Sequence, residues 1–174
     1  MLPRRKTTTT RSFRVDEAAL EAIEKDAEAR NVSVNTLVNQ LLLSYANFDR
    51  YFMQLPMIKI ASDAFGNLLA AVPDEVAGEM GRRTGANLVK SVILSKHGVV
   101  NLDTVLDYFR MINDYAKIYS FNESELDRKK SVTLIHKWGR KGSIYYANYV
   151  ASVFEMIDVQ PKVSTTENSV TAVF

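Results

Sequence analysis

The first fourteen residues carry side chains that can bind a polyanion. Five of them are cationic, and none is acidic: the cations are Arg4, Arg5, Lys6, Arg11 and Arg14. Such an arm suits the phosphates of DNA, because each contact releases a condensed counterion. A soluble, unstructured N-terminus has the same composition, so the arm alone leaves both interpretations open.

The segment TTTTRSFRVDE, residues 7–17, has the composition of a β-strand. It is rich in β-branched and aromatic residues and lacks Gly and Pro. In a strand, Phe13 and Val15 face one side. The opposite side carries Thr10, Ser12 and Arg14. Arg14 can donate two hydrogen bonds to guanine, and the two hydroxyls can bond base edges. The alternative is an ordinary solvated sheet face.

Two helices are expected after the strand. Asp16 can cap the first, and Ser33 can cap the second, which is expected to continue to about residue 53 before Pro56 stops it. Burial of the large apolar side chains of this segment contributes too little free energy to offset the cost of ordering some forty residues. A second copy or a host domain must therefore complete the core. A second copy also offers the strand an antiparallel partner about a two-fold axis.

Residues 11–42, RSFRVDEAALEAIEKDAEARNVSVNTLVNQLL, resemble the ribbon-helix-helix family of DNA-binding proteins, the Arc/MetJ-type repressors and their antitoxin relatives. The likeness rests on the alternation in the strand, the acidic first helix, and the turn at residues 32–36 that opens the second helix. Asn31 stands where the family often has Gly, and Asn tolerates the same backbone conformation.

The resemblance implies an intertwined homodimer whose two-stranded ribbon lies in the major groove. It implies base reading by Thr10, Ser12 and Arg14. Backbone N–H groups at the start of the second helix would hold a phosphate. The expected phosphate contacts are Arg4, Arg5, Lys6, Arg11, Ser33, Val34 and Asn35. The expected dimer core is Phe13, Val15, Leu20, Ile23, Val38, Leu41 and Leu42.

Residues 57–174 are expected to form a second domain. Helices are expected at 62–70, from residue 73 to Gly98, at 102–113 and at 143–157, and strands at 57–60, 116–121, 131–136, 162–165 and 169–174. Gly78, Gly81 and Gly85 weaken the first half of the helix that starts near residue 73. Separate runs of helices and antiparallel strands indicate an α+β fold.

Aromatic residues near the middle of this second domain suggest a small-molecule pocket. His136, Trp138, Tyr145 and Tyr149 lie close in sequence, with polar residues between them. Aromatic walls with a few polar groups are typical of ligand pockets. A packed helix face explains the same residues equally simply, so both interpretations stay open.

Other classes of function have little support. The chain has no Cys and only two His residues, so we expect neither a catalytic thiol nor a metal site, and no cofactor. No phosphate loop is present, and the protein is not expected to be an enzyme. No signal peptide or membrane span is recognisable, so we expect a cytoplasmic protein.

These observations together predict a homodimeric, sequence-specific DNA-binding transcriptional regulator of the repressor type. The expected parts are a basic arm at 1–7, a DNA-binding and dimerisation domain at 8–53, and a domain at 57–174 that senses a ligand or supports assembly. Two alternatives remain. One is an antitoxin whose C-terminal region binds a partner protein. The other is a ligand-binding or enzymatic domain that the N-terminal segment dimerises.

Overall fold

The computed structural model describes residues 8–126 and 129–174, and the chain divides into two units. Unit 1 is Met1–Ser44, and unit 2 is Tyr45–Phe174. The division falls earlier than the expected boundary after residue 53. The reason is that Phe48, Tyr51 and Phe52 pack against the core of unit 2. Residues 45–53 therefore belong to the second unit.

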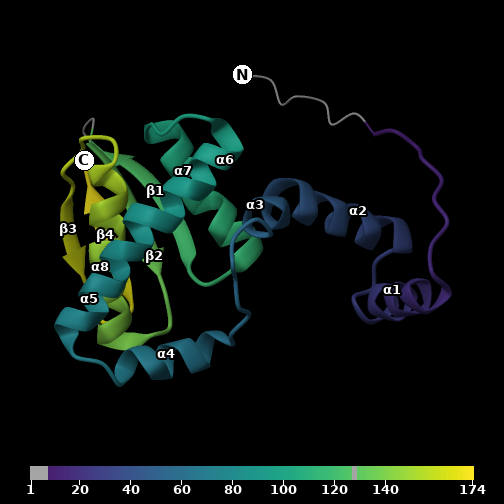
Figure 1. Ribbon diagram of the computed structural model, residues 1–174, viewed down its shortest axis with the longest axis horizontal. Coiled ribbons are helices and arrows are strands. Elements are labelled where there is room, and N and C mark those ends of the chain that lie inside the picture. The colour runs from purple at the N-terminus through teal and green to yellow at the C-terminus, as the bar shows by residue number, and fades with distance from the viewer. Residues whose placement is uncertain (1–7, 127–128) are drawn as a thin grey trace. The chain divides into compact units, whose positions relative to one another are not determined.

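Unit 1 contains two capped helices, α1 (Glu17–Ala29) and α2 (Val34–Ser44) (Figure 1). The Asp16 carboxylate accepts a hydrogen bond from the Ala19 N–H at 3.1 Å, as an N-cap does. The Ser33 hydroxyl accepts one from the Thr36 N–H at 3.1 Å. Asn31 has a φ of 52°, the left-handed conformation that ends α1. The two helix starts expected from the sequence are confirmed.

The expected N-terminal β-ribbon is wrong. Residues 8–16 have no regular secondary structure, and every strand in the described residues lies between Ser120 and Val173. A ribbon-helix-helix fold with an intertwined ribbon is therefore not the architecture of unit 1. The physical reason is that β-propensity alone does not hold a strand. A strand must pair its backbone N–H and C=O groups, and the described part of unit 1 offers no neighbouring strand.

Unit 2 consists of helices followed by a sheet, with one long helix between the strands. Its helical elements are η1 (Tyr45–Asp49), α3 (Arg50–Phe52), α4 (Ser62–Ala70), α5 (Asp74–Arg83), η2 (Thr84–Val89), α6 (Lys90–His97), α7 (Leu102–Met111), η3 (Ile112–Ala116) and α8 (Gly139–Glu155). The elements labelled η are π-helical. Gly98, in the left-handed conformation, ends α6 as the sequence predicted. No helix among the described residues has both the length and the hydrophobicity to cross a bilayer.

The sheet has four antiparallel strands in the order β1-β2-β4-β3. The strands are β1 (Ser120–Leu126), β2 (Lys129–Ile135), β3 (Lys162–Thr165) and β4 (Ser169–Val173). Val132, Leu134, Val170 and Ala172 are buried in the core. Helix α8 packs against β3, β4 and α5, so it lies between the sheet and the helical layer (Figure 1). The α+β fold expected for this part of the chain is confirmed.

Three details of unit 2 differ from the sequence prediction. Residues 57–60 form no strand. The strand expected at 116–121 starts only at Ser120, because Lys117 has a φ of 55° and ends η3 in the left-handed conformation. The first strand also extends further than expected, since β1 continues past residue 121 to Leu126 and pairs with β2. Cross-strand pairing overrides the low strand propensity of this charged stretch.

The glycines of α5 and η2 let this helix approach α8 closely. A Cβ atom added at Gly81 would overlap the backbone carbonyl of Tyr145, and one added at Gly85 would overlap the Ser152 hydroxyl. The sequence indicated only that these glycines weaken the helix. In the structure they are what allows two helices to pack backbone against backbone.

Candidate functional site

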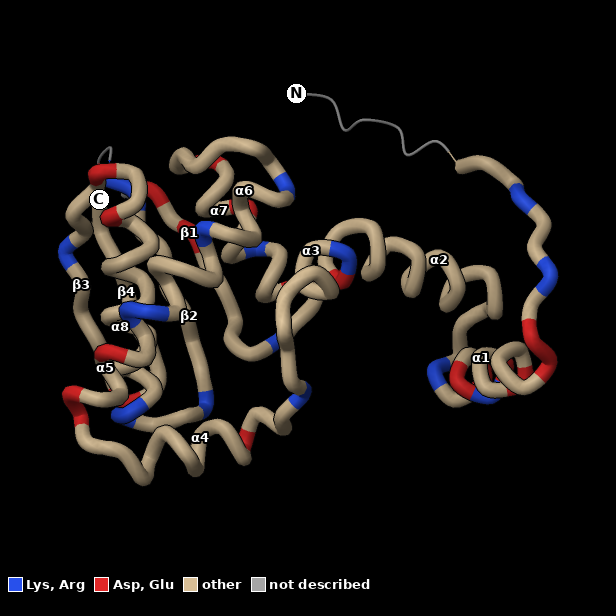
Figure 2. The backbone as a smooth tube through the Cα atoms, in the orientation of Figure 1, with Lys and Arg blue, Asp and Glu red and all other residues tan. Residues whose placement is uncertain are grey.

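The side chains expected to read DNA bases lie on the irregular segment before α1. Thr10, Ser12 and Arg14 are all exposed, and so is Arg11. Figure 2 shows the cations of this segment, followed by the acidic start of α1. The other three cations, Arg4, Arg5 and Lys6, lie outside the described residues. The segment thus presents guanidinium groups to solvent without the strand geometry that the sequence predicted.

The second expected DNA contact is the N-terminus of α2. Val34 and Asn35 are the first two residues of the helix, and its first turn has no acidic residue. The Ser33 hydroxyl lies 2.8 Å from the Thr36 hydroxyl and accepts from the Thr36 N–H, so Ser33 caps the helix. Free N–H groups and the helix dipole at such an end attract anions. The geometry is that of an ordinary N-cap that a phosphate can approach.

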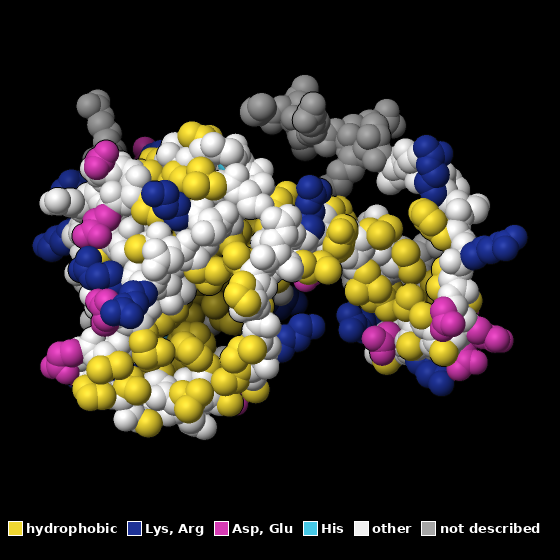
Figure 3. Space-filling view, viewed as in Figure 1, with side chains coloured by type: hydrophobic (Ala, Val, Ile, Leu, Met, Phe, Trp, Pro, Cys, Tyr) yellow, Lys and Arg dark blue, Asp and Glu magenta, His cyan; other side chains and the backbone are white. Residues whose placement is uncertain are grey.

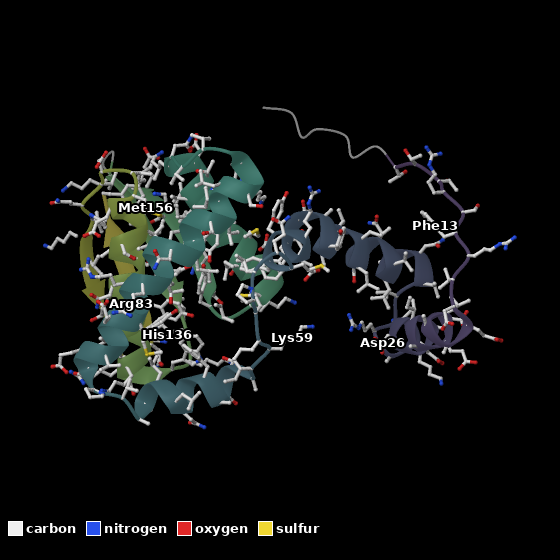
Figure 4. The ribbon with its side chains drawn as sticks, viewed as in Figure 1. Phe13, Asp26, Lys59, Arg83, His136 and Met156 are labelled. Atoms are coloured by element: carbon white, nitrogen blue, oxygen red, sulfur yellow. The ribbon has the colours of Figure 1, made fainter. Side chains whose placement is uncertain are left out.

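The residues expected to form a dimer core are largely exposed within one chain. Phe13 is 76% exposed, Leu41 50% and Leu42 56%. Val15 and Leu20 are also exposed, while Ile23 and Val38 are half-buried. Only Ala27 and Leu37 are buried among the described residues of unit 1. Apolar side chains gather on the visible surface of unit 1 (Figure 3), and Phe13 projects from the segment before α1 (Figure 4).

Unit 2 contains a large apolar cavity of about 1040 Å³. Its walls come from η1, α3, the connection to α4, α4 itself, η2, α7, η3 and α8. The lining residues are Tyr45, Phe48, Asp49, Phe52, Met53, Leu55, Met57, Ile58, Lys59, Ile60, Ser62, Phe65, Thr84, Leu88, Tyr108, Ile112, Ala116, Lys117, Ile118, Trp138, Tyr145, Tyr146 and Tyr149. Hydrophobic side chains surround a hollow in this unit (Figure 3).

Hydroxyl groups supply the polar atoms of the inner wall. The Tyr149 hydroxyl donates to the Tyr108 hydroxyl at 3.1 Å, and the Trp138 indole N–H donates to the Ser62 hydroxyl at 3.0 Å. The Tyr146 hydroxyl is buried and has no hydrogen-bond partner among the described residues. Burial raises the pKa of Tyr146 and Tyr149 well above the usual value, because it penalises the charged phenolate. These phenols therefore stay protonated at neutral pH.

Three of the four predicted pocket residues lie on this cavity: Trp138, Tyr145 and Tyr149. The fourth, His136, does not line it. Its Nε2 lies 3.0 Å from the Ser143 hydroxyl, and its Nδ1 accepts a hydrogen bond from the Trp138 N–H at 3.2 Å. Burial lowers the pKa of His136 to about 4. His136 is thus a neutral residue that fixes the start of α8.

The sequence reading missed the wall that residues 45–60 provide. Tyr45, Phe48 and Phe52 follow one another at helical spacing, and this is the signal that could have revealed it. The sequence prediction placed these residues in the DNA-binding domain, so their contribution to the cavity wall was not recognised. Tyr108 and Tyr146 were missed for another reason, since buried aromatic residues of a core and of a cavity wall have the same sequence pattern.

Comparison with known proteins adds no relative. No protein-family model matches the chain, and no curated protein sequence matches it. The functional reading therefore depends on the residues and geometry of this chain.

Proposed function

We propose that the chain is a homodimeric, sequence-specific DNA-binding protein that regulates transcription. The basic segment before α1 and the N-terminus of α2 contact DNA, and unit 2 senses a small molecule or supports assembly. In this proposal Arg14, Thr10 and Ser12 contact base edges. Arg11 and the first turn of α2 contact phosphates. The proposal does not need a paired ribbon, because an irregular basic segment can also follow a groove of DNA.

The state of the arginines carries this proposal. Arg30, Arg82, Arg83, Arg110 and Arg140 each form an ion pair with a carboxylate. Arg50 lies over the Tyr51 ring, 5.2 Å from its centroid. Arg11 and Arg14 are exposed and form no ion pair with any described residue. They are also followed by the acids of α1, which repel a polyanion and so keep it away from the start of that helix. Unpaired guanidinium groups on one short segment favour an anionic partner such as DNA.

The exposed apolar side chains of unit 1 support the homodimer. Leu20, Leu41 and Leu42 are each at least 38% exposed, although the helices that carry them bury little else. A patch of this kind on two short helices is typical of an interface. A second copy of the same surface can cover it about a two-fold axis. Two copies would also place two basic segments on one DNA molecule, which raises affinity through their linkage.

The antitoxin alternative finds less support in unit 2. A tail that wraps a toxin is usually disordered alone, whereas residues 45–174 contain a packed core with Phe109, Phe154 and Leu134 at most 1% exposed. We therefore keep the regulator as the main proposal. Resistance of isolated residues 45–174 to protease would argue further against the antitoxin.

A binding selection with the purified full-length protein tests the proposal. Genomic DNA fragments are selected at a stated salt concentration, and the enriched sequence is then used to measure affinity by fluorescence anisotropy. Arg14→Ala is expected to weaken binding to that sequence about tenfold or more, since one good base contact is worth about 1–3 kcal/mol. Arg83→Ala is the matched control, because it removes one exposed arginine from unit 2 (Figure 4).

Two results would overturn the proposal. One is a selection that enriches no sequence at any salt concentration. The other is an Arg14→Ala protein that binds the enriched sequence as tightly as Arg83→Ala does. If Arg14→Ala weakens binding equally on all sequences, Arg14 contacts a phosphate and not a base. The slope of log affinity against log salt concentration would then fall by about 1.

A further inference from the structure

The cavity of unit 2 is too large to be a packing defect. Protein interiors are close-packed and contain few voids larger than one water molecule. Pockets for small molecules measure about 300–1,000 Å³, and this cavity measures about 1040 Å³. The cavity is open to solvent, because lining side chains such as Met53 and Ile58 are 73% and 83% exposed, so part of its apolar wall faces water instead of making packing contacts. An occupant that restores those contacts would stabilise the unit.

The cavity wall holds one buried polar group that has no partner. Tyr146 is 1% exposed, lines the cavity, and its hydroxyl has no hydrogen-bond partner among the described residues. Leaving a buried hydroxyl unpaired is costly, so such groups are rare in folded proteins. The neighbouring hydroxyls of Tyr108 and Tyr149 bond each other. The Tyr146 hydroxyl is itself buried, so a ligand atom that reaches it by displacing the side chains around it would supply the missing hydrogen bond.

The distribution of charge indicates what kind of ligand fits. Apart from Asp49, Lys59 and Lys117, the lining residues are uncharged. Both lysines are exposed, and the Lys59 side chain points outward from the connection before α4 (Figure 4). The wall around Tyr146 is formed by the rings of Trp138, Tyr145 and Tyr149, whose hydroxyl or indole groups are neutral. Placing a charge against this wall would carry a large desolvation penalty.

We propose that this cavity binds a neutral, predominantly apolar small molecule with one hydrogen-bond acceptor, and that the Tyr146 hydroxyl donates to that acceptor. Ring-containing molecules fit best, because aromatic rings from α8, η1 and α4 form the walls. Tyr146 is the residue that sets the position of the ligand, and the aliphatic and aromatic wall supplies most of the affinity.

The inference deepens the sensing role that the proposed function gives to unit 2. Its biological consequence rests on that proposal, whereas binding itself is measured without DNA. The two failures are therefore distinguishable. A protein that binds the probe but no DNA sequence contradicts the regulator and keeps the ligand site. A protein that binds a DNA sequence but not the probe contradicts the ligand site and keeps the regulator.

Prodan, a neutral naphthalene with one ketone, is the probe for the test. Its emission rises in an apolar environment and moves to longer wavelength when its ketone accepts a hydrogen bond. The full-length protein is titrated with prodan and, for comparison, with the anionic dye 1-anilinonaphthalene-8-sulfonate. Prodan is expected to bind at one site per chain with a Kd of about 200 µM or lower, as its size allows. The anionic dye is expected to bind at least about tenfold more weakly.

Three variants locate the site and the hydrogen bond. Tyr146→Phe removes one oxygen and is expected to weaken prodan binding about fivefold to tenfold, with emission moved to shorter wavelength. Ala116→Phe places a ring inside the cavity, where it occupies space that prodan needs, and is expected to abolish binding, whereas Ala70→Phe places the same ring on an exposed position of α4 outside the cavity. If Ala116→Phe does not fold, Leu88→Trp fills the cavity from η2 instead.

Each outcome of these titrations supports or contradicts a stated part of the proposal. Failure of the wild-type protein to bind prodan would overturn the proposal, as would binding that survives a folded, cavity-filling variant. If the anionic dye binds more tightly than prodan, the site favours an acidic ligand and not a neutral one. If Tyr146→Phe leaves the affinity for prodan and the emission of prodan unchanged, the Tyr146 hydroxyl does not donate a hydrogen bond to the ligand. If prodan binding is lost when the protein self-associates, a second copy of the chain occupies the cavity, which contradicts a small-molecule site.

Discussion

Trp138 lies flat against Tyr146, with ring centroids 5.2 Å apart and ring planes at 11°. The same indole donates its N–H to Ser62 on α4, while Tyr146 belongs to α8. This stacked pair therefore joins two helices at the wall of the cavity. It also places the chain's one tryptophan beside Tyr146, whose buried hydroxyl, like that of Tyr119, has no hydrogen-bond partner among the described residues.

The first prediction uses Trp138 as an internal reporter. Because Trp138 lines the cavity, its fluorescence is expected to fall by more than about half when prodan saturates the site, through energy transfer over a short distance. Steady-state emission during a prodan titration measures this. The midpoint should agree with the Kd from prodan emission, and Ala116→Phe should abolish the quenching. Full prodan binding with unchanged Trp138 emission would place the probe elsewhere.

The second prediction concerns the acid sensitivity of unit 2. His136 is 4% exposed, and burial lowers its pKa to about 4. A histidine in the unfolded chain titrates near 6.5, so below that pH the unfolded state takes up a proton that the folded state does not. Stability is therefore complete above about pH 6.5 and falls toward pH 4. We expect a loss of at most about 2 kcal/mol by pH 5.

Urea unfolding followed by Trp138 emission measures this loss, because the only tryptophan reports on unit 2 alone. His136→Gln should flatten the dependence between about pH 6.5 and 5. Hydrogen bonds from Lys141 and Arg140 lower the pKa of Asp74; burial raises the pKa of Asp107, but Lys96 and His97 outweigh it and lower that pKa overall. Protonation of these carboxylates therefore reduces stability only near and below their usual pKa. An equal slope in the wild type and in His136→Gln would show that another group controls this window.

Local signals in the sequence predicted where α1 and α2 begin and where α6 ends. Asp16, Ser33 and Gly98 act through their own backbone and side chains, so their roles can be inferred from neighbouring residues. The strand before α1 could not be inferred in the same way. Its Thr-rich composition favours a strand, but pairing depends on a partner that the local sequence does not contain.

The cavity shows the same limit for a functional site. Trp138, Tyr145 and Tyr149 could be proposed because they cluster within one segment of sequence. Phe48 and Tyr108 could not, because they join the same wall from elements far apart in the chain. Gly81 illustrates a third case, since a glycine that permits close packing and one that merely weakens a helix look alike until the facing helix is known.

The third prediction follows from that close packing. Gly81→Ala should destabilise unit 2 by about 3 kcal/mol or more, because the new methyl group overlaps the Tyr145 carbonyl and forces α5 away from α8. Gly78→Ala is the matched control on the same helix, where the nearest atom is the end of the Asn148 side chain at 3.0 Å. That side chain can move, so the change should stay within about 1 kcal/mol. Urea unfolding measures both losses. Similar losses in the two variants would show that the overlap with the Tyr145 carbonyl is not what makes Gly81 necessary.

The last prediction concerns the dimer. Leu41 lies on α2 and is 50% exposed in a single chain, so its burial against a second copy is the simplest way to remove it from water. Leu41→Asp would place a charge in that interface, where desolvation without a partner costs several kcal/mol. We expect sedimentation to report a dimer for the wild type and a monomer for Leu41→Asp.

Leu68→Asp is the control for this change. Leu68 is 59% exposed on α4 of unit 2 and does not belong to the helices that carry the proposed interface, so the variant should remain dimeric. Trp138 emission should be the same in both variants, which would show that unit 2 stays folded. DNA affinity should fall only in Leu41→Asp, because a monomer presents a single basic segment. A Leu41→Asp protein that remains dimeric would place the self-association surface outside α2, and a monomeric wild type that still binds DNA would remove the need for a dimer altogether.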